Sequence, residues 1–271
     1  MPELAEVEFY RQRWNPGLGK RITRVFVHPK AGVFKTSDPQ QIVKHLTGAK
    51  LISSEAAAKQ MLFKARAIDK TDLWLGIHLG MTGEMLAPAA NYHPRASDHL
   101  VLIQEERSLV FSDFRMFGRV QFATGPDAPE WWSKIAPAVS SPEFTVAAVA
   151  TFLKRRARTA IKPVLLMQER FPGVGNWMAD EILWRAAIHP KRPAGSLLPD
   201  EIKTLHRETR WVCKHALQII GASETLVDPP KSWLFQHRWS EGGKDPKTGT
   251  PLVREDIGGR TTCWSPARQK L

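Results

Sequence analysis

The sequence is poor in cysteine, with only Cys213 and Cys263 among its 271 residues. Two thiols cannot build a framework of several disulfides or supply a four-cysteine zinc site, so both classes of scaffold are excluded. Long apolar runs are also missing, since none approaches the roughly 18 residues of a membrane-spanning helix. The N-terminus lacks the basic and then apolar pattern of a signal peptide. We therefore expect an intracellular protein without a membrane span or a membrane partner.

Acidic residues are too few to balance the basic ones. The chain has 39 Lys and Arg against 27 Asp and Glu, a formal net charge of +12. The excess is concentrated after residue 150, where 21 basic residues face 12 acidic ones, against 18 and 15 before it. A basic half indicates a polyanionic partner such as nucleic acid, although a merely soluble surface can have the same composition. The length allows two domains, each with its own core.

The rest of the chain is organised around FPGVGNWMADEILWRAAIHP, residues 171–190. Gly173 and Gly175 flank Val174, so the backbone can take a tight turn that a Cβ would forbid. The helix that follows begins near Asn176 with its first N–H groups unpaired, and the helix dipole there favours an anion. The pattern indicates a phosphate site, and an ordinary tight helix–helix connection is the alternative that spacing leaves open.

The N-terminal MPELAEVEFYRQRW has the apolar spacing of a helix, with acidic residues in its first turn. Pro2 suits the start of a helix, which is its ordinary interpretation. Removal of Met1 would also leave Pro2 as a secondary amine, which titrates well below a lysine. Such an amine can attack a sugar C1′ and form an iminium, and Glu3 and Glu6 could handle the protons. Composition alone does not demand this chemistry.

Residues 20–124 consist of short β-rich segments separated by turns, which predicts a two-layer β-sandwich. Two loops in this region, HLGMTGEM and SDFRMFGR, contain Met81 in the first and Arg115 with Phe117 in the second. These side chains could form a wedge that enters a base stack and fills the place of an extruded base. A buried Met and Phe with a solvated Arg is the alternative.

The chain then changes pattern three times. We divide it into a β-sandwich at residues 1–130, a Pro- and Ser-rich linker at 131–142, a helical domain at 143–230 and a terminal hairpin at 231–271. One long helix is predicted from Pro199 to Gly221.

In the terminal segment we expect two short strands around Asp245 to Thr250 and a second turn at Gly258 and Gly259. That turn would present Arg260 rigidly, as bidentate contact with a phosphate requires, although it could be one surface Arg among many.

Five motifs in order, PELAEVE, HLGMTG, DFRMFG, GVGNWMADEILW followed by IHP, and IGGRTT, resemble the formamidopyrimidine-DNA glycosylase/endonuclease VIII family. The resemblance covers nearly the whole chain. It implies an α+β fold, with an N-terminal helix and β-sandwich, a helical domain containing a helix–two-turn–helix, and a terminal β-hairpin. It also implies a bifunctional DNA glycosylase and abasic-site (AP) lyase that flips and excises oxidised bases and then nicks the strand by elimination.

By this resemblance Pro2 is the nucleophile, Glu3 assists base departure and proton transfer, and Glu6 orients the site. Lys59 matches a lysine that contacts the lesion region and the flanking phosphate, and a solvated strand lysine is its alternative interpretation.

The resemblance also implies a set of DNA-contacting residues. Asn176 and Arg260 would bind phosphates at the flipped nucleotide, and Met81, Arg115 and Phe117 would fill the gap. Lys162, in TAIKPVLLMQ, is counted with the DNA-binding residues. The expected partner is double-stranded DNA with damaged or abasic sites, bound by a monomer in the cytoplasm or at the nucleoid, with no cofactor and no metal.

The chain departs from the family pattern in four places. The family's common zinc finger uses four cysteines, whereas this tail has Cys263 alone and resembles the zincless-finger branch. Ala5 replaces a usual Pro, and Met116 replaces a common second Arg.

The stretch from Gly221 to Trp239 is also shorter than the segment that caps guanine lesions, which argues against 8-oxoguanine. The set of Met81, Arg115 and Phe117 favours the formamidopyrimidine branch, so the preferred lesion stays open. Two other functions also remain: a non-catalytic reader of damaged DNA, favoured if Met1 is retained, and a general DNA-binding module.

Overall fold

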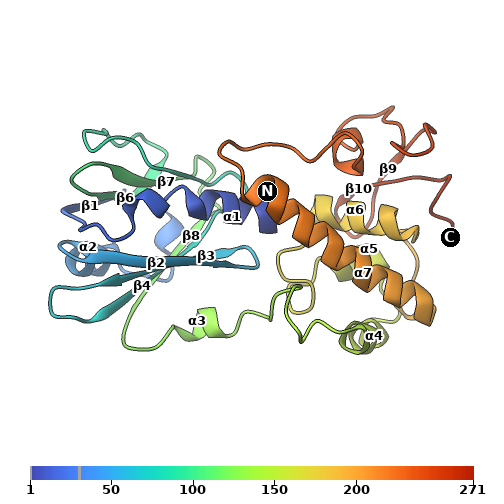
Figure 1. Cartoon of the computed structure of the whole chain (residues 1–271), viewed down its shortest axis with the longest axis horizontal. Helices are drawn as coiled ribbons and strands as arrows, with labels where there is room; N and C mark the ends of the chain where they lie inside the picture. The colour runs from blue at the N-terminus through green and yellow to red at the C-terminus, as the bar shows by residue number, and fades with distance from the viewer. Residues whose placement is uncertain (1, 30–31) are drawn as a thin grey trace. The chain divides into compact units, whose positions relative to one another are not determined.

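The computed structural model describes residues 2–29 and 32–271 (Figure 1). The chain divides into two compact units. The first contains Pro2 and residues 6–135, and the second contains residues 3–5 and 136–271. Each is described by itself below. The N-terminal helix α1 (Leu4–Gln12) is present where the apolar spacing predicts it.

The first unit contains two four-stranded antiparallel sheets. The order in one sheet is β1 (Arg24–Val27), β6 (Asp98–Ile103), β7 (Ser108–Ser112) and β5 (Glu84–Leu86). The order in the other is β2 (Lys50–Ala57), β3 (Gln60–Arg66), β4 (Asp72–His78) and β8 (Arg119–Thr124). Shorter elements complete the unit: η1 (Asn15–Gly17), η2 (Gly32–Phe34), α2 (Pro39–Leu46) and α3 (Glu130–Ser133). The prediction of an N-terminal β-sandwich is confirmed.

The central strands β6 and β7 are buried along their whole length. Leu100 and Leu102 lie in the main core, while the alternate residues Val101 and Ile103 belong to a second apolar cluster. Tyr92, from the loop before β6, packs against that second cluster and donates a hydrogen bond to the buried Asp98 (2.6 Å). Because both faces of the sheet are covered, these strands have continuous rather than alternating apolar sequences.

The second unit is mainly helical. Its helices are α4 (Val146–Arg155), α5 (Ile161–Leu165), α6 (Asn176–Ala186) and α7 (Pro199–Ala216), with short turns at η3 (Ala194–Ser196), η4 (Leu217–Gly221) and η5 (Leu234–His237). The Glu201 side chain accepts the Leu198 N–H (2.7 Å) and so fixes the start of α7 after that residue. The predicted start at Pro199 and end at Gly221 are both confirmed, the last turn being a π-turn.

The terminal hairpin lies elsewhere than the sequence suggests. Its strands are β9 (Val253–Asp256) and β10 (Thr261–Trp264). Around Asp245 to Thr250, where two strands are expected, the structure has an isolated antiparallel bridge between Lys244 and Pro251 in their place. The Asp245 carboxylate accepts the Lys247 N–H (2.8 Å), which closes a local turn instead of a strand. The turn at Gly258 and Gly259 is present, with positive φ at both residues.

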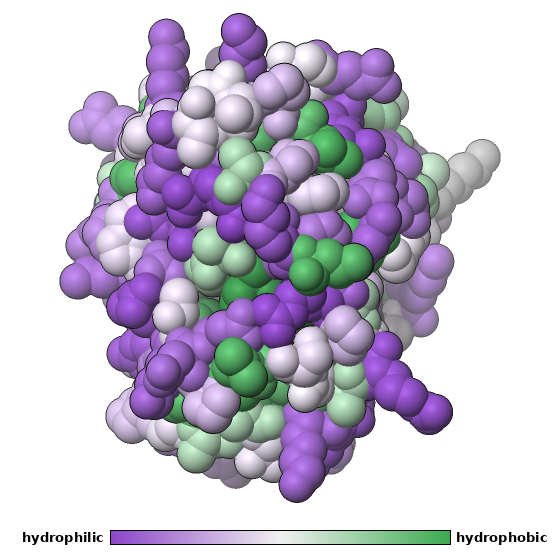
Figure 2. Space-filling model, turned by 90° about the vertical axis from the view of Figure 1, so that its right-hand side faces the viewer, coloured by the Kyte–Doolittle hydropathy of each residue, from purple (hydrophilic) through white to green (hydrophobic). Residues whose placement is uncertain are grey.

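The surface shown in Figure 2 is mostly hydrophilic, and its hydrophobic residues form small separate patches. Within residues 2–29 and 32–271, no helix is long and apolar enough to cross a membrane.

Candidate active site and nucleic-acid interface

The anion at the start of α6 is the carboxylate of Glu3. This side chain is buried and accepts backbone N–H groups from Gly175 (2.8 Å), Trp177 (2.9 Å) and Met178 (3.2 Å). The sequence pattern predicts a phosphate at this helix terminus, whereas the structure fills it with a carboxylate from the N-terminal segment. Glu3 therefore satisfies the unpaired donors of the helix and is itself held in one position.

Gly175 is required by this arrangement because the backbone approaches Glu3 very closely. A Cβ built at this residue would lie 2.3 Å from Glu3 Cδ and 2.5 Å from Oε1. Neighbouring Leu4 donates its N–H to the Gly173 carbonyl (3.0 Å). The GVG turn thus binds the N-terminal segment through both its backbone and its lack of a side chain.

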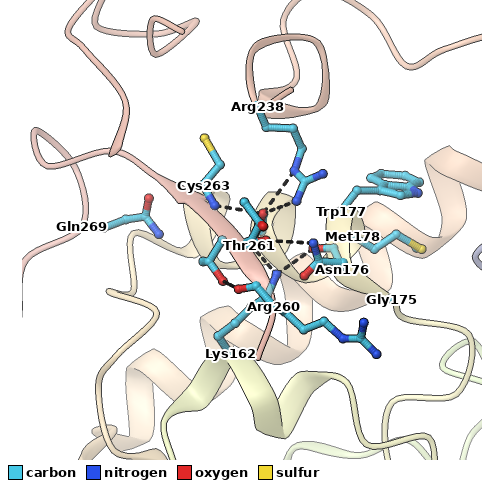
Figure 3. Close-up of polar contacts among 12 residues, drawn as sticks. Lys162, Gly175, Asn176, Trp177, Met178, Arg238, Arg260, Thr261, Cys263 and Gln269 are labelled. Carbon is cyan, nitrogen blue, oxygen red and sulfur yellow. Dashed lines mark hydrogen bonds and ion pairs between the residues drawn. The ribbon is translucent and has the colours of Figure 1, made fainter. Parts of the chain in front are cut away.

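Asn176 and Arg260 lie on neighbouring segments of the second unit (Figure 3). Asn176 Nδ2 donates to the carbonyl of Thr261, the residue after Arg260 (2.8 Å). The Arg260 carbonyl accepts the Ile257 N–H (3.0 Å), which closes the hairpin turn, and the Arg260 side chain is exposed. An exposed guanidinium on a fixed turn is suited to contact with a phosphate.

The structure corrects the prediction that Lys162 contacts DNA. Its side chain is 0% exposed, and Nζ donates to the Asp180 carboxylate and to the Asn176 carbonyl (2.7 Å) (Figure 3). A buried ammonium with both partners inside the protein cannot reach a phosphate on the surface. Lys162 instead supports the residue that begins α6.

Sequence reasoning missed Asp180 and Arg238. The carboxylate of Asp180 is fully buried and pairs with Lys162 on one side and with Arg238 (2.6 Å) on the other. Asp180 falls inside the GVGNWMADEILW motif, but a single sequence does not identify cations 18 residues before it and 58 residues after it.

In the first unit, the wedge residues are on the surface. Met81 is 38% exposed and Phe117 is 55% exposed, so the alternative of a buried Met and Phe is wrong. The Arg115 guanidinium lies over the Phe117 ring, 4.7 Å from its centroid. Exposed apolar side chains on loops are what insertion into a base stack requires.

Asp113 joins the two wedge loops. Its carboxylate accepts hydrogen bonds from Thr82 Oγ1 (2.6 Å) in one loop and from the Gly118 N–H (2.7 Å) in the other. The loops also touch directly, since a Cβ at Gly80 would lie 2.5 Å from the carbonyl carbon of Phe117. Sequence reasoning treated Asp113 only as part of the motif and missed this role.

His78 supports the Met81 loop from the end of β4. Its Nδ1 accepts the Gly80 N–H (3.0 Å), so Nε2 carries the proton of the neutral ring. Burial, together with the charges of Arg119 and Lys59, lowers the pKa of His78 to about 4. Lys59 therefore acts electrostatically on the base of this loop.

The other predicted catalytic residues, Lys59, Pro2 and Glu6, are all half-buried. Lys59 is half-buried in the two-residue turn between β2 and β3, rather than within a strand. Pro2 and Glu6 are half-buried, Pro2 directly before Glu3 and Glu6 on α1. The structure groups Met81, Arg115 and Phe117 in the first unit. Glu3, Asn176 and Arg260 are grouped in the second. Whether Met1 is removed concerns a residue outside those described.

The chain matches two known domain families over most of its length and known proteins over nearly all of it. A family described as the formamidopyrimidine-DNA glycosylase N-terminal domain matches residues 1–120, and the formamidopyrimidine-DNA glycosylase H2TH domain matches residues 135–227. Formamidopyrimidine-DNA glycosylase of Geobacter metallireducens is 36% identical over 99% of this chain and 100% of its own. That of Roseiflexus sp. is 32% identical, with 100% of both chains covered.

Solved structures agree with the sequence comparison. The chain resembles wild-type Lactococcus lactis Fpg (MutM) in complex with DNA containing an oxidised pyrimidine, with a TM-score of 0.88, 26% identity and 100% coverage of both chains. A complex of Lactococcus lactis Fpg with DNA containing an abasic site gives a TM-score of 0.87 at 25% identity, covering 99% of this chain and 100% of that one. The chain therefore belongs to the formamidopyrimidine-DNA glycosylase family.

Proposed function

We propose that this protein is a DNA glycosylase of base excision repair that removes oxidised bases and also acts as an AP lyase. The observation that carries the proposal is the fixed carboxylate of Glu3, which is buried on three backbone N–H groups directly after Pro2. The relatives are formamidopyrimidine-DNA glycosylases, and the solved relatives hold DNA with an oxidised pyrimidine or an abasic site. Double-stranded DNA with such sites is the proposed partner.

The chemistry begins at Pro2 once Met1 has been removed. The lone pair of the secondary amine forms a bond to C1′ of the damaged nucleotide, and the glycosidic bond breaks with its electron pair leaving on the base. The departing base takes up a proton, and the amine nitrogen loses its own. The C1′–O4′ bond then breaks with O4′ taking up a proton, which leaves an iminium between Pro2 and C1′. Loss of the proton on C2′ then eliminates the 3′ phosphate, and a second elimination releases the 5′ phosphate. The carboxylates of Glu3 and Glu6 are the groups nearest in sequence for these proton transfers.

Binding is divided between phosphate contacts and insertion into the base stack. Arg260 and Asn176 are proposed to contact phosphates, with Lys59 as a further cation near the lesion. Met81 and Phe117, with Arg115 stacked on the phenylalanine ring, would occupy the gap that the flipped base leaves. Extrusion costs a few kcal/mol, and the weakened pairing of a damaged base reduces that cost.

The terminal hairpin is proposed to be of the zincless type. The tail has Cys263 alone, so four-cysteine ligation is impossible. Side chains instead hold the segments before and after the hairpin to α6: Trp184 Nε1 donates to the Asp245 carboxylate (3.2 Å), and the Arg268 guanidinium lies 5.1 Å from the Trp184 ring centroid.

Borohydride trapping tests the proposal. Wild-type protein, with loss of Met1 verified by intact mass, is incubated with duplexes carrying an abasic site, 8-oxoguanine or an oxidised pyrimidine. We expect a covalent adduct that mass spectrometry maps to the N-terminal residue, because reduction fixes an iminium. Pro2→Gly keeps an α-amine but loses the ring that directs it, so its adduct yield should fall severalfold. Pro16→Gly, which changes an exposed proline in η1, is the matched control and should trap normally.

The same experiment separates this function from a non-catalytic reader of damaged DNA. If protein that has lost Met1 binds all three duplexes and forms no adduct with any of them, the enzyme assignment is wrong and the reader is the better assignment. The relative yields on the three duplexes would also rank the lesions.

A further inference from the structure

A group of buried charges lies inside the second unit beneath the terminal hairpin. Asp180 projects from α6, Lys162 from α5, and Arg238 follows η5. Their side chains are 0%, 0% and 5% exposed, respectively. Because charges are expensive to bury, such a group needs complete pairing to be tolerated.

Asp180 uses its whole hydrogen-bonding capacity on three partners. Oδ2 accepts from Arg238 Nη2 (2.6 Å) and Nε (3.1 Å) and from the Cys263 N–H of β10 (3.0 Å). Oδ1 accepts from Lys162 Nζ. An ionised carboxylate accepts about four hydrogen bonds and donates none, so it matches this set of donors. An asparagine would have one acceptor oxygen and would point an amide donor at other donors.

The charges in this region balance only while Asp180 is ionised. Burial lowers the pKa of the Lys162 ammonium, and the nearby Asp180 and Glu3 carboxylates oppose that effect, whereas the Arg238 charge adds to it. Two cations and two carboxylates thus neutralise one another. Removal of the Asp180 charge leaves Lys162 and Arg238 buried against Glu3 alone.

The network also reaches the residues on both sides of the proposed phosphate site. Cys263 lies three residues after Arg260, and its N–H is bound by Asp180. Thr261 directly follows Arg260, and its carbonyl accepts from Asn176 Nδ2 (2.8 Å). Lys162 in turn donates to the Asn176 carbonyl (2.7 Å) (Figure 3). Strand β10 is therefore attached to α6 at residues 176 and 180, one helical turn apart, and Lys162 bonds to both.

We propose that Asp180 is a positioning residue that anchors the terminal hairpin to α6 through charge and so fixes Arg260 beside Asn176 for contact with a phosphate. This inference rests on the proposed function for the role of Arg260, but the anchoring itself does not. Asp180 touches neither DNA nor the reacting atoms in this scheme. It acts through the backbone of β10.

Thiol labelling tests the anchoring without DNA. The chain has one cysteine on β10, Cys263, and one on α7, Cys213, and both are buried. Burial raises the pKa of each thiol to about 12, with the Asp180 charge contributing at Cys263, so neither thiol should react while the unit is closed. Because loss of the Asp180 charge by itself lowers the Cys263 pKa, Arg238→Met, which removes a cation that lowers this pKa, is labelled in parallel. In Asp180→Asn we expect Cys263 to be labelled at least about tenfold faster than in the wild type, with Cys213 still protected, because only the hairpin opens.

Asp200→Asn is the matched control for charge. Asp200 is an exposed residue of the first turn of α7, paired with Lys203 (2.9 Å). Its substitution changes the net charge of the protein by the same amount as Asp180→Asn but leaves β10 untouched. Both thiols should remain as slow to react as in the wild type.

The role of the anchor in binding is tested by the salt dependence of affinity for a duplex with an abasic-site analogue. Asp180→Asn should weaken binding about tenfold and reduce the slope of log affinity against log salt by about 0.9, the value for one phosphate. Arg260→Ala should have the same effect, and the double variant should be no worse than either single one. In single-turnover excision, the half-saturating DNA concentration should rise by the same factor in Asp180→Asn and in Arg260→Ala, as expected if Asp180 acts through the Arg260 contact.

If Cys263 stays protected from labelling in Asp180→Asn, Asp180 does not anchor the hairpin. If Cys263 is labelled faster but the salt slope of DNA binding is unchanged, the anchor does not position Arg260 for a phosphate contact. If both cysteines of Asp180→Asn are labelled at the same rate, the whole unit has opened and the variant does not test the anchor. Arg238→Met is then the test, since it keeps the Lys162–Asp180 pair and removes only one partner of Asp180. Labelling of Cys263 alone in Arg238→Met would then support the proposal, and any other labelling pattern would end it. Wild-type protein that forms no iminium adduct would refute the proposed function, while the thiol result would stand by itself.

Discussion

Glu3 shows how one side chain changes the chemistry available at a helix terminus. Free N–H groups at the start of a helix attract phosphates, but at α6 three such groups are bound to the Glu3 carboxylate. In the proposed function, phosphate contacts are therefore assigned to side chains such as that of Arg260. The carboxylate is in turn prevented from rotating by these three hydrogen bonds.

Gly175→Ala should disturb Glu3 without altering any charge. The added Cβ would lie 2.3 Å from Glu3 Cδ, so the carboxylate or the first turn of α6 must move. We expect a loss of about 1–3 kcal/mol in the free energy of unfolding. Excision at saturating lesion DNA should also fall at least about tenfold, since a misplaced catalytic group loses rate steeply. Chemical denaturation and single-turnover kinetics would measure the two effects.

Glu3→Gln provides the comparison, because it places an amide donor against three N–H donors. Its effect on excision should be large in the wild-type background and small in Gly175→Ala, since both substitutions displace the same group. Normal excision by Gly175→Ala would mean that the position of Glu3 does not limit the reaction.

At the scale of elements, α6 is unusual in being buried on all sides from Trp177 to Trp184. It contacts α7, η5 and β10, so its polar residues Asp180 and Glu181 lie inside the protein. A helix of this kind carries no amphipathic stripe. Its buried polar side chains determine which segments pack around it.

Glu181 should make stability depend on pH. Burial raises its pKa to about 8, against the opposing charge of Arg185, while its side chain accepts the Phe235 N–H (3.2 Å). The folded state then holds a proton that the unfolded state releases near pH 4.5. Stability from this group is complete below about pH 4.5 and is lost as the pH rises towards 8. Glu181→Gln should remove this loss, on the order of a few kcal/mol, when urea unfolding is compared at pH 5 and pH 8.

Glu201→Gln is a control of opposite sign. The hydrogen bond from Arg192 lowers the pKa of Glu201, so its contribution is present at neutral pH and is lost as the pH falls through the acidic range. The variant should therefore be less stable than the wild type at pH 7. An equal pH profile for Glu181→Gln and the wild type would show that Glu181 is ionised in the folded protein.

Helix ends and turns could be predicted from the sequence where a proline or glycine marks them. Strands could not be predicted where the same residues suit both a turn and a strand. The start of α7 at Pro199 and the turn at Gly258 and Gly259 were predictable because proline and glycine restrict or free the backbone directly. The strands of the hairpin were not, because VRED and TTCW lack an apolar alternation. Asp245 to Thr250 has short polar residues that suit a turn as well as a strand edge.

At the scale of the whole molecule, the positive charge and the wedge should contribute differently to DNA binding. Phosphate contacts respond to salt and are indifferent to the lesion, whereas side chains that fill a gap respond to the lesion. Between 50 and 200 mM salt, affinities for undamaged and abasic duplexes should both fall steeply, by about a thousandfold or more if six or more phosphates are contacted. The ratio of the affinity for the abasic duplex to that for the undamaged duplex should change by no more than about twofold over this salt range.

Met81→Ala combined with Phe117→Ala should reduce the preference for the abasic duplex over the undamaged one and leave the salt slope unchanged, since both side chains are apolar and exposed. Arg260→Ala should reduce the salt slope and leave that preference unchanged. Fluorescence anisotropy across a salt series would measure both quantities. A ratio that collapses to one at high salt in the wild type would show that lesion preference is electrostatic.

The motifs of the sequence were sufficient to predict the family and the exposure of the wedge. They were insufficient for contacts between distant segments. Lys162 cannot be recognised as buried from the sequence, because its partner Asp180 is 18 residues away and nothing near it in sequence marks it as buried. Glu3 was expected near the reaction, but its bonds to residues 175, 177 and 178 could not be read from one chain.

The joint between the wedge loops has a consequence for protein engineering. Asp113 bonds to Thr82 across the joint, and Gly80 leaves no room between the loops for a side chain. Transfer of the DFRMFG loop alone into another β-sandwich would leave behind the Met81 loop, with which it forms these contacts. The transferable cassette is both loops with Asp113 and Gly80, and homologous recombination that separates them should yield chimaeras that fold but no longer discriminate damaged DNA.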